Sequence, residues 1–160
     1  MFETTADQFF ITAGNAEGFT ELNAFDHALL SAGIGDVNLI KLSSILPPQA
    51  KQVNKFTLPS GQLIPVAYAS ITSEKPGEII AAAVSIGIPE DDAFPGLIME
   101  YHGVTTKKIA ESRAIEMAEA GLIHRGRKIK NIIVQATEHE VEQCGCAFAA
   151  VVLWWSHFRK

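Results

Sequence analysis

Two adjacent serines raise the possibility that this chain cuts its own backbone. Ser43 and Ser44 stand in the segment KLSSILPP, directly after an apolar run. In a strained backbone, the Ser44 hydroxyl can attack the carbonyl carbon of Ser43 and convert the amide into an ester. Elimination across the ester breaks the chain and leaves a dehydroalanine, which hydrolyses to an N-terminal pyruvoyl group. The alternative is a strand end whose hydroxyls cap a turn before Pro47-Pro48.

A serine hydroxyl is a weak nucleophile, so this chemistry needs help from nearby groups. Asn38, six residues before Ser44, either makes an Asx turn at a strand entrance or donates a hydrogen bond to the oxyanion of the acyl shift. Glu100, in the segment GLIMEYHG, either faces solvent or lies in a cavity, where burial would raise its pKa and let it hold a proton. His102 shares its strand face and either assists or is simply exposed.

A metal site is a weaker interpretation of His139, Cys144 and Cys146. The side-chain types suit zinc, but their spacing matches no strong zinc pattern and no fourth ligand is evident. Two cysteines separated by one residue rarely form a disulfide, which favours free thiols in the cytoplasm. We therefore expect no metal.

Length and charge limit the remaining classes. With 160 residues, the chain is expected to form one domain, residues 1–160. A formal net charge of −5 argues against a nucleic-acid partner. The sequence has neither a secretory signal pattern nor an apolar run long enough to span a membrane, so a cytoplasmic protein with no membrane partner is expected.

The elements that must position these residues follow from hydrophobic periodicity. Helices are expected over 20–32 and 105–120, the second stopped by Gly121. Strands are expected over 9–13, 37–42, 63–72, 78–88, 96–104, 129–137 and 144–155, the first broken at Gly14-Asn15 and the fourth buried on both faces. The order of the elements predicts an α+β domain with a largely antiparallel sheet.

Taken together, the motifs resemble the pyruvoyl-dependent arginine decarboxylases. The resemblance rests on Asn38, then KLSSILPP, GLIMEYHG and VEQCGCAFAAVVLWW, in this order and at these separations. It implies a four-layer αββα sandwich and trimers, or pairs of trimers, with active sites between subunits. It also implies a zymogen that cleaves into a β chain, 1–43, and an α chain, 44–160, whose N-terminal pyruvoyl group comes from Ser44.

The same resemblance assigns roles to individual residues. Asn38 matches a residue linked to processing, and Glu100 matches the proton donor in catalysis. Asp26 matches the acid that holds the substrate guanidinium, and Ser43 matches a residue that contacts the ligand. The implied reaction converts L-arginine to agmatine, a polyamine precursor, and CO₂ through a Schiff base. The alternatives are a decarboxylase for another amino acid and a non-catalytic oligomeric protein that binds an amine or guanidinium.

Overall fold

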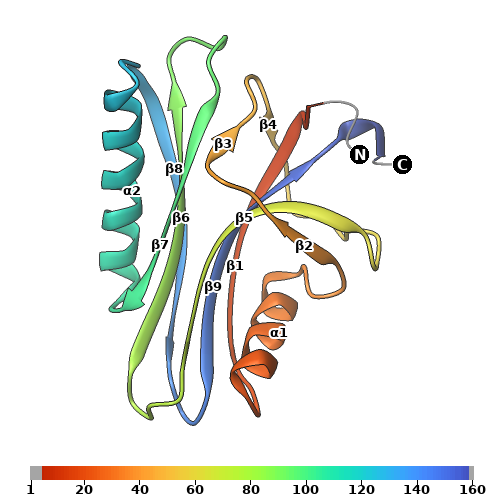
Figure 1. Cartoon of the computed structure of the whole chain (residues 1–160), viewed down its shortest axis with the longest axis vertical. Helices are drawn as coiled ribbons and strands as arrows, with labels where there is room; N and C mark the ends of the chain where they lie inside the picture. The colour runs from red at the N-terminus through yellow and green to blue at the C-terminus, as the bar shows by residue number, and fades with distance from the viewer. Residues whose placement is uncertain (1–4, 159–160) are drawn as a thin grey trace.

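The computed structural model describes residues 5–158 and places their strands in two sheets (Figure 1). The five-stranded sheet has the order β2-β5-β9-β1-β4 and the four-stranded sheet the order β3-β7-β6-β8. All pairings are antiparallel except β1 with β4 and β2 with β5. The strands are β1 (Gln8–Glu17), β2 (Asn38–Lys41), β3 (Ile45–Leu46), β4 (Lys51–Gln52), β5 (Leu63–Ser73), β6 (Ile79–Pro89), β7 (Gly96–Val104), β8 (Ile129–Glu140) and β9 (Gly145–Trp154).

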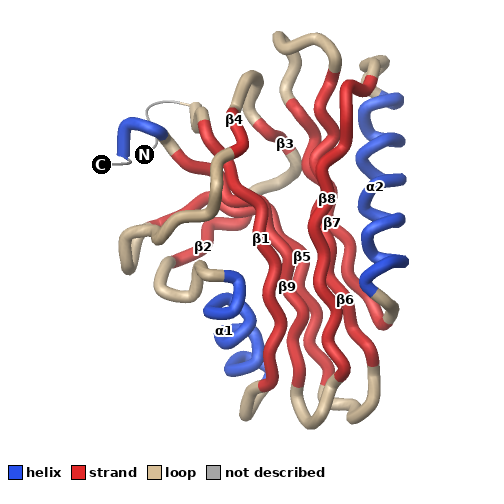
Figure 2. Tube along the Cα trace, turned by 180° about the vertical axis from the view of Figure 1, so that it is seen from behind, coloured by secondary structure: helices blue, strands red, loops and turns tan. Residues whose placement is uncertain are grey.

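Two helices cover the outer faces of the two sheets. Helix α1 (Glu21–Ala32) packs on the five-stranded sheet and α2 (Lys107–His124) on the four-stranded sheet, so the layers run helix, sheet, sheet, helix (Figures 1 and 2). A short 3₁₀ helix, η1 (Ser156–Phe158), follows β9. The predicted α+β fold and its four layers are therefore confirmed. Neither helix in the described part of the chain is long and apolar enough to cross a membrane.

The core is divided by the layers. One cluster lies between the sheets and includes Ile98 of β7 and Val151 of β9, while two others lie beneath α1 and α2. Because β9 contacts both the opposite sheet and α1, all its residues are buried, which explains its unbroken apolar sequence. As predicted, β6 is buried on both faces along nearly its whole length.

Two glycines that were expected to interrupt elements instead lie inside them. Strand β1 runs straight through Gly14, because this glycine allows α1 to approach: a Cβ there would lie 2.4 Å from the Ala28 carbonyl oxygen. Helix α2 likewise continues past Gly121, where a Cβ would lie 2.1 Å from Leu97 Cδ2. The helix ends before Gly126, which adopts a φ of 65°. The predicted break and stop were wrong because these glycines serve close packing.

Candidate active site

The serine pair lies where the chain crosses from one sheet to the other. Strand β2 ends at Lys41 in the five-stranded sheet, and β3 begins at Ile45 in the four-stranded sheet. Before the serine pair, the Leu42 N–H donates a 3.0 Å hydrogen bond to the Val66 carbonyl oxygen in the five-stranded sheet. At the serine pair, the Ile98 N–H in the four-stranded sheet donates a 2.7 Å hydrogen bond to the Ser44 carbonyl oxygen. The Ser43–Ser44 peptide bond is thus held between anchors in different sheets.

An open pocket of about 350 Å³ surrounds this crossover. Its lining comes from the crossover itself, from β7 and from α2: Lys41, Leu42, Ser43, Ser44, Met99, Glu100 and Met117. Gly121 does not line the pocket but helps to shape it, because the absence of its side chain lets α2 lie against Leu97 and Met99 of β7. The structure therefore brings the serine pair and Glu100 together in one pocket.

Glu100 has an environment that favours its neutral form. Its side chain is 21% exposed, and burial raises its pKa above the ordinary glutamate value. The Lys41 ammonium, whose Nζ lies 3.6 Å from Glu100 Oε2, lowers the pKa, but the net shift remains upward. A carboxyl that keeps its proton more readily than usual is suited to general acid chemistry.

Lys41 is a site residue that sequence reasoning missed. Besides the ion pair with Glu100, its Nζ lies 4.4 Å from the centroid of the Tyr68 ring. The only signal in the sequence was its position three residues before Ser44. Met99 and Met117 were also missed as lining residues, because their approach depends on how α2 packs.

Three of the expected residues do not line this pocket within one chain. Asn38, at the start of β2, donates through Nδ2 to the Gly61 carbonyl oxygen at 3.1 Å. Asp26 is exposed on α1, and its side chain makes no hydrogen bond or ion pair with the described residues. His102 is exposed near the end of β7.

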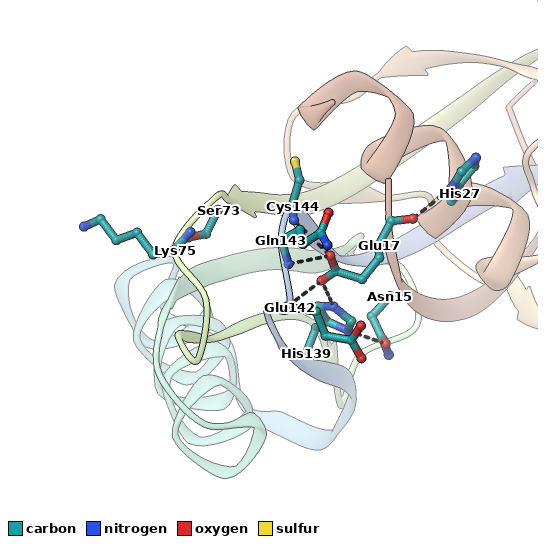
Figure 3. Close-up of polar contacts among 9 residues, drawn as sticks. All are labelled: Asn15, Glu17, His27, Ser73, Lys75, His139, Glu142, Gln143 and Cys144. Carbon is teal, nitrogen blue, oxygen red and sulfur yellow. Dashed lines mark hydrogen bonds and ion pairs between the residues drawn. The ribbon is translucent and has the colours of Figure 1, made fainter. Parts of the chain in front are cut away.

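A second polar cluster joins β1 to the β8–β9 turn (Figure 3). The Glu17 carboxylate accepts hydrogen bonds from the backbone N–H groups of residues 142, 143 and 144 at 2.9–3.0 Å and from His139 Nε2 at 2.6 Å. Burial alone would raise the pKa of Glu17, but these hydrogen bonds outweigh it and lower the pKa to about 2. Asn15 Oδ1 lies 3.0 Å from His139 Nδ1.

This cluster changes the interpretation of His139. The ring pairs with Glu17 and Asn15 rather than joining Cys144 and Cys146 in a metal site, and both cysteines are buried free thiols. Within residues 5–158, no group of three or more His, Cys, Asp or Glu side chains could hold a metal ion. Because the Glu17 carboxylate makes four hydrogen bonds to His139 and the β8–β9 turn, we interpret the cluster as structural: it holds the turn against the end of β1.

The geometry at the crossover fits a group made from Ser44. If the chain is cut before Ser44, the Ile98 hydrogen bond and the pairing of β3 with β7 would still hold the new N-terminus. That terminus would lie in the pocket that also contains Glu100. The residues present therefore fit an N-terminal pyruvoyl group with an acid beside it.

Known proteins resemble this chain over nearly its whole length. The model of the pyruvoyl-dependent arginine decarboxylase (PvlArgDC) family matches residues 8–158. A pyruvoyl-dependent arginine decarboxylase of Methanocaldococcus jannaschii is 54% identical over 145 residues, which cover 91% of this chain and 88% of the relative. A pyruvoyl-dependent arginine decarboxylase of Pyrococcus abyssi is 44% identical over 157 residues, which cover 96% of this chain and 99% of the relative.

A solved structure supports the fold assignment. The structure of a pyruvoyl-dependent histidine decarboxylase at pH 8 is similar with a TM-score of 0.50 at 18% identity. The match covers 58% of this chain and 51% of that one, so the likeness concerns the fold. The family match and the similarity to the archaeal relatives lead to one conclusion: this chain belongs to the pyruvoyl-dependent arginine decarboxylase family.

Proposed function

We propose that this protein is a self-processing, pyruvoyl-dependent decarboxylase that converts L-arginine to agmatine and CO₂. The observation that carries the proposal is the position of Ser44, held between two sheets in the same pocket as Glu100, in a chain of this family. The relatives' names supply the substrate.

Processing would occur at the peptide bond between Ser43 and Ser44. The Ser44 hydroxyl attacks the Ser43 carbonyl carbon, the amide nitrogen leaves, and an ester forms. Elimination then releases Ser43 as the C-terminus of a chain of residues 1–43. The remaining dehydroalanine takes up water and loses ammonia, giving chain 44–160 with a pyruvoyl N-terminus. Each of the two chains keeps the hydrogen bond that holds it next to the cut: Leu42 to Val66 in the first chain, and Ser44 to Ile98 in the second. The fold is therefore expected to survive the cut.

Asn38 is proposed to act in processing by way of strand β2. Its side chain donates to Gly61 and its backbone N–H donates to Gln62, so it fixes the start of the strand that leads into the serine pair. This role complements the anchor at Leu42, because both hold the chain on the amino side of the scissile bond.

In catalysis, the pyruvoyl carbonyl supplies the electron sink into which the electrons of the breaking bond to CO₂ can move. The protein must then return a proton to the substrate Cα. Glu100 is the acid proposed for this step, because burial raises its pKa and it lines the same pocket as Ser44. Ser43 is proposed to contact the substrate, since it lines the pocket as well.

Asp26 of one subunit is proposed to bind the guanidinium of a substrate that lies in the pocket of a neighbouring subunit. A carboxylate suits a guanidinium because the two groups can form paired hydrogen bonds. Asp26 lies on an exposed stripe of α1 between Leu22 and Leu30, which are 76% and 52% exposed. An apolar stripe of this kind is typical of an interface. We therefore propose a trimer of processed chains, or a pair of trimers, with α1 at a subunit contact.

The deciding experiment is the intact mass of the purified, denatured protein, compared with a Ser44→Ala variant. We expect two masses for the wild type, split between Ser43 and Ser44 with a pyruvoyl-blocked larger chain, and one mass for the variant. Arginine labelled at the carboxyl carbon should then release labelled CO₂, with histidine and aspartate as comparisons. A single wild-type mass without CO₂ release would instead favour a non-catalytic protein that binds amines or guanidinium.

A further inference from the structure

Lys41 is a pocket residue whose charge has no role in the steps described so far. It lines the pocket together with Ser43, Ser44 and Glu100. Its side chain is 55% exposed and its Nζ lies 3.6 Å from Glu100 Oε2. An ion pair that is this exposed and this long contributes little to stability, because solvent screens it. The ammonium can therefore change partners at low cost.

The substrate of a decarboxylase brings a competing anion into this pocket. If Glu100 is to protonate Cα, the carboxylate on that same carbon must first lie near Glu100. Two carboxylates in a partly buried pocket repel each other, which favours protonation of one of them. Lys41 and Glu100 are the only charged side chains among the described residues that line the pocket.

We propose that the Lys41 ammonium exchanges the Glu100 carboxylate for the α-carboxylate of the bound substrate, so that Glu100 takes up a proton from solvent as the substrate enters. This inference rests on the function proposed above. It makes Lys41 a substrate-binding residue and ties the protonation of Glu100 to the arrival of the molecule that needs the proton.

The proton and charge balance closes over one turnover. The bond between Cα and the carboxyl carbon breaks, CO₂ leaves without charge, and the electron pair left at Cα takes the Glu100 proton. Lys41 then has no substrate anion and returns to the newly formed Glu100 carboxylate. The one proton consumed comes from solvent, as the loss of a carboxylate as neutral CO₂ requires.

The surroundings of Glu100 support the exchange. Burial raises its pKa, and among the described residues Lys41 provides the only charge that shifts this pKa. The neighbouring positions are apolar: Val84 pairs with Glu100 across β6 and β7, and Met117 reaches the pocket from α2. His102 is exposed two residues further along β7. When Lys41 moves away, burial therefore acts on Glu100 unopposed.

Proton uptake can be measured without turnover. The ligand is 5-guanidinopentanoic acid, which keeps the guanidinium and carboxylate of arginine but has no α-amine. Titration calorimetry in buffers of different ionisation enthalpy should show uptake approaching about one proton per site for the wild type. Glu100→Gln should show none, and butylguanidine, which lacks the carboxylate, should cause none in the wild type. Absence of proton uptake by the wild type with the acid would overturn the proposal.

Variants of Lys41 supply the second test. Lys41→Met should bind 5-guanidinopentanoic acid roughly tenfold more weakly, as expected for one lost charge-assisted hydrogen bond, while its affinity for butylguanidine is unchanged. Lys41→Arg should restore most of the affinity. Intact masses of both variants show whether processing is normal. Equal affinities of Lys41→Met and wild type for both ligands would remove Lys41 from substrate binding, whereas the proposed function fails only if the wild type releases no CO₂ from arginine.

Discussion

Two glutamates illustrate how surroundings set the chemistry of single residues in this protein. Glu17 accepts three backbone hydrogen bonds and one from His139, and its pKa falls to about 2 despite burial. Glu100 is partly buried, Lys41 alone among residues 5–158 opposes the effect of burial on its pKa, and that pKa rises. The first acid is therefore held as a carboxylate for structure, and the second is disposed to carry a proton.

Replacing Glu100 by Gln should separate catalysis from folding. The amide has nearly the same shape but no acidic proton, so decarboxylation should fall by roughly 10²–10⁴-fold, the usual contribution of a general acid. The measurement is CO₂ release from carboxyl-labelled arginine, with intact mass as the control for processing. Wild-type turnover in a normally processed variant would exclude Glu100 as the proton donor.

Replacing Glu17 by Gln should destabilise the protein in a pH-dependent way. The folded pKa of about 2 lies below the reference value of 4.5, so this carboxylate stabilises the fold above pH 4.5. The contribution is lost as the pH falls from 4.5 towards 2. Near neutral pH, we expect the variant to lose about 2 kcal/mol of unfolding free energy, the usual value for hydrogen bonds to a charged group.

Urea denaturation at several pH values measures this effect. The difference between wild type and Glu17→Gln should be full at pH 6 and shrink towards pH 3. Glu119→Gln is the matched control, because Glu119 is exposed on α2 and its side chain makes no hydrogen bond or ion pair with the described residues. A difference that stays constant with pH would show that the Glu17 charge is not what stabilises the turn.

At the residue scale, sequence identified the groups whose chemistry is local. Ser43 and Ser44 are adjacent, and Glu100 is an acid in an apolar strand, so both could be found from the sequence. Lys41 and Glu17 could not, since their partners Glu100 and His139 come from distant segments and the pairs exist only after the sheets have formed.

At the scale of elements, close packing of helix on sheet depends on particular glycines. At Gly14, a Cβ would lie 2.4 Å from the Ala28 carbonyl oxygen and 2.5 Å from the Ala32 nitrogen, both backbone atoms of α1. Backbone of this kind cannot move aside as a flexible side chain can. The separation of α1 from β1 is therefore set at this position.

Gly14→Ala should push α1 away from β1 and destabilise the fold by about 1–3 kcal/mol, the usual cost of overpacking. Gly103→Ala in β7 is the matched control, because a Cβ there would have its nearest neighbour, the Tyr101 hydroxyl oxygen, at an ordinary 3.4 Å. Urea denaturation of both variants gives the comparison. Equal stability of the two variants would contradict the close contact at Gly14.

The sequence predicted the long elements well because their periodicity is strong, but it missed β3 and β4. Each contains two residues, too few for any periodic signal. Yet β3 follows Ser44 directly and fixes the crossover on the four-stranded sheet. The short strand next to the chemistry is thus set by tertiary pairing with β7, which no local pattern reveals.

At the scale of the whole molecule, one chain does not bring all the expected site residues together. Ser43, Ser44 and Glu100 share a pocket, while Asp26 lies on the exposed stripe of α1. The periodicity of residues 20–32 gave no sign of this separation, because a helix that packs on another subunit and one that packs on its own core have similar patterns. Only the family resemblance implied active sites between subunits. Leu22, an apolar residue within the helix expected over 20–32, is largely exposed.

The proposed sharing of the active site between subunits makes a specific prediction for mixed assemblies. Asp26→Asn and Glu100→Gln should each be nearly inactive as pure proteins. When the two are co-expressed with different tags and purified through both, some subunit contacts combine an intact Asp26 from one chain with an intact Glu100 from the other. With random assembly and one contact type, roughly a third of the sites in a doubly tagged trimer, or roughly a quarter in a doubly tagged pair of trimers, regain both acids. CO₂ release should therefore reappear at about that fraction of wild-type activity.

The controls decide between sites shared by two subunits and sites formed by one. The two variants mixed after separate purification, without subunit exchange, should stay inactive. If Asp26 instead served the pocket of its own chain, every site in the mixed assembly would still lack one acid and no activity would return. Leu22→Lys should weaken the contact by burying a charge in it, and light scattering should then show smaller assemblies. Recovery of activity in the mixture, together with dissociation by Leu22→Lys, would place α1 at the interface that completes the site.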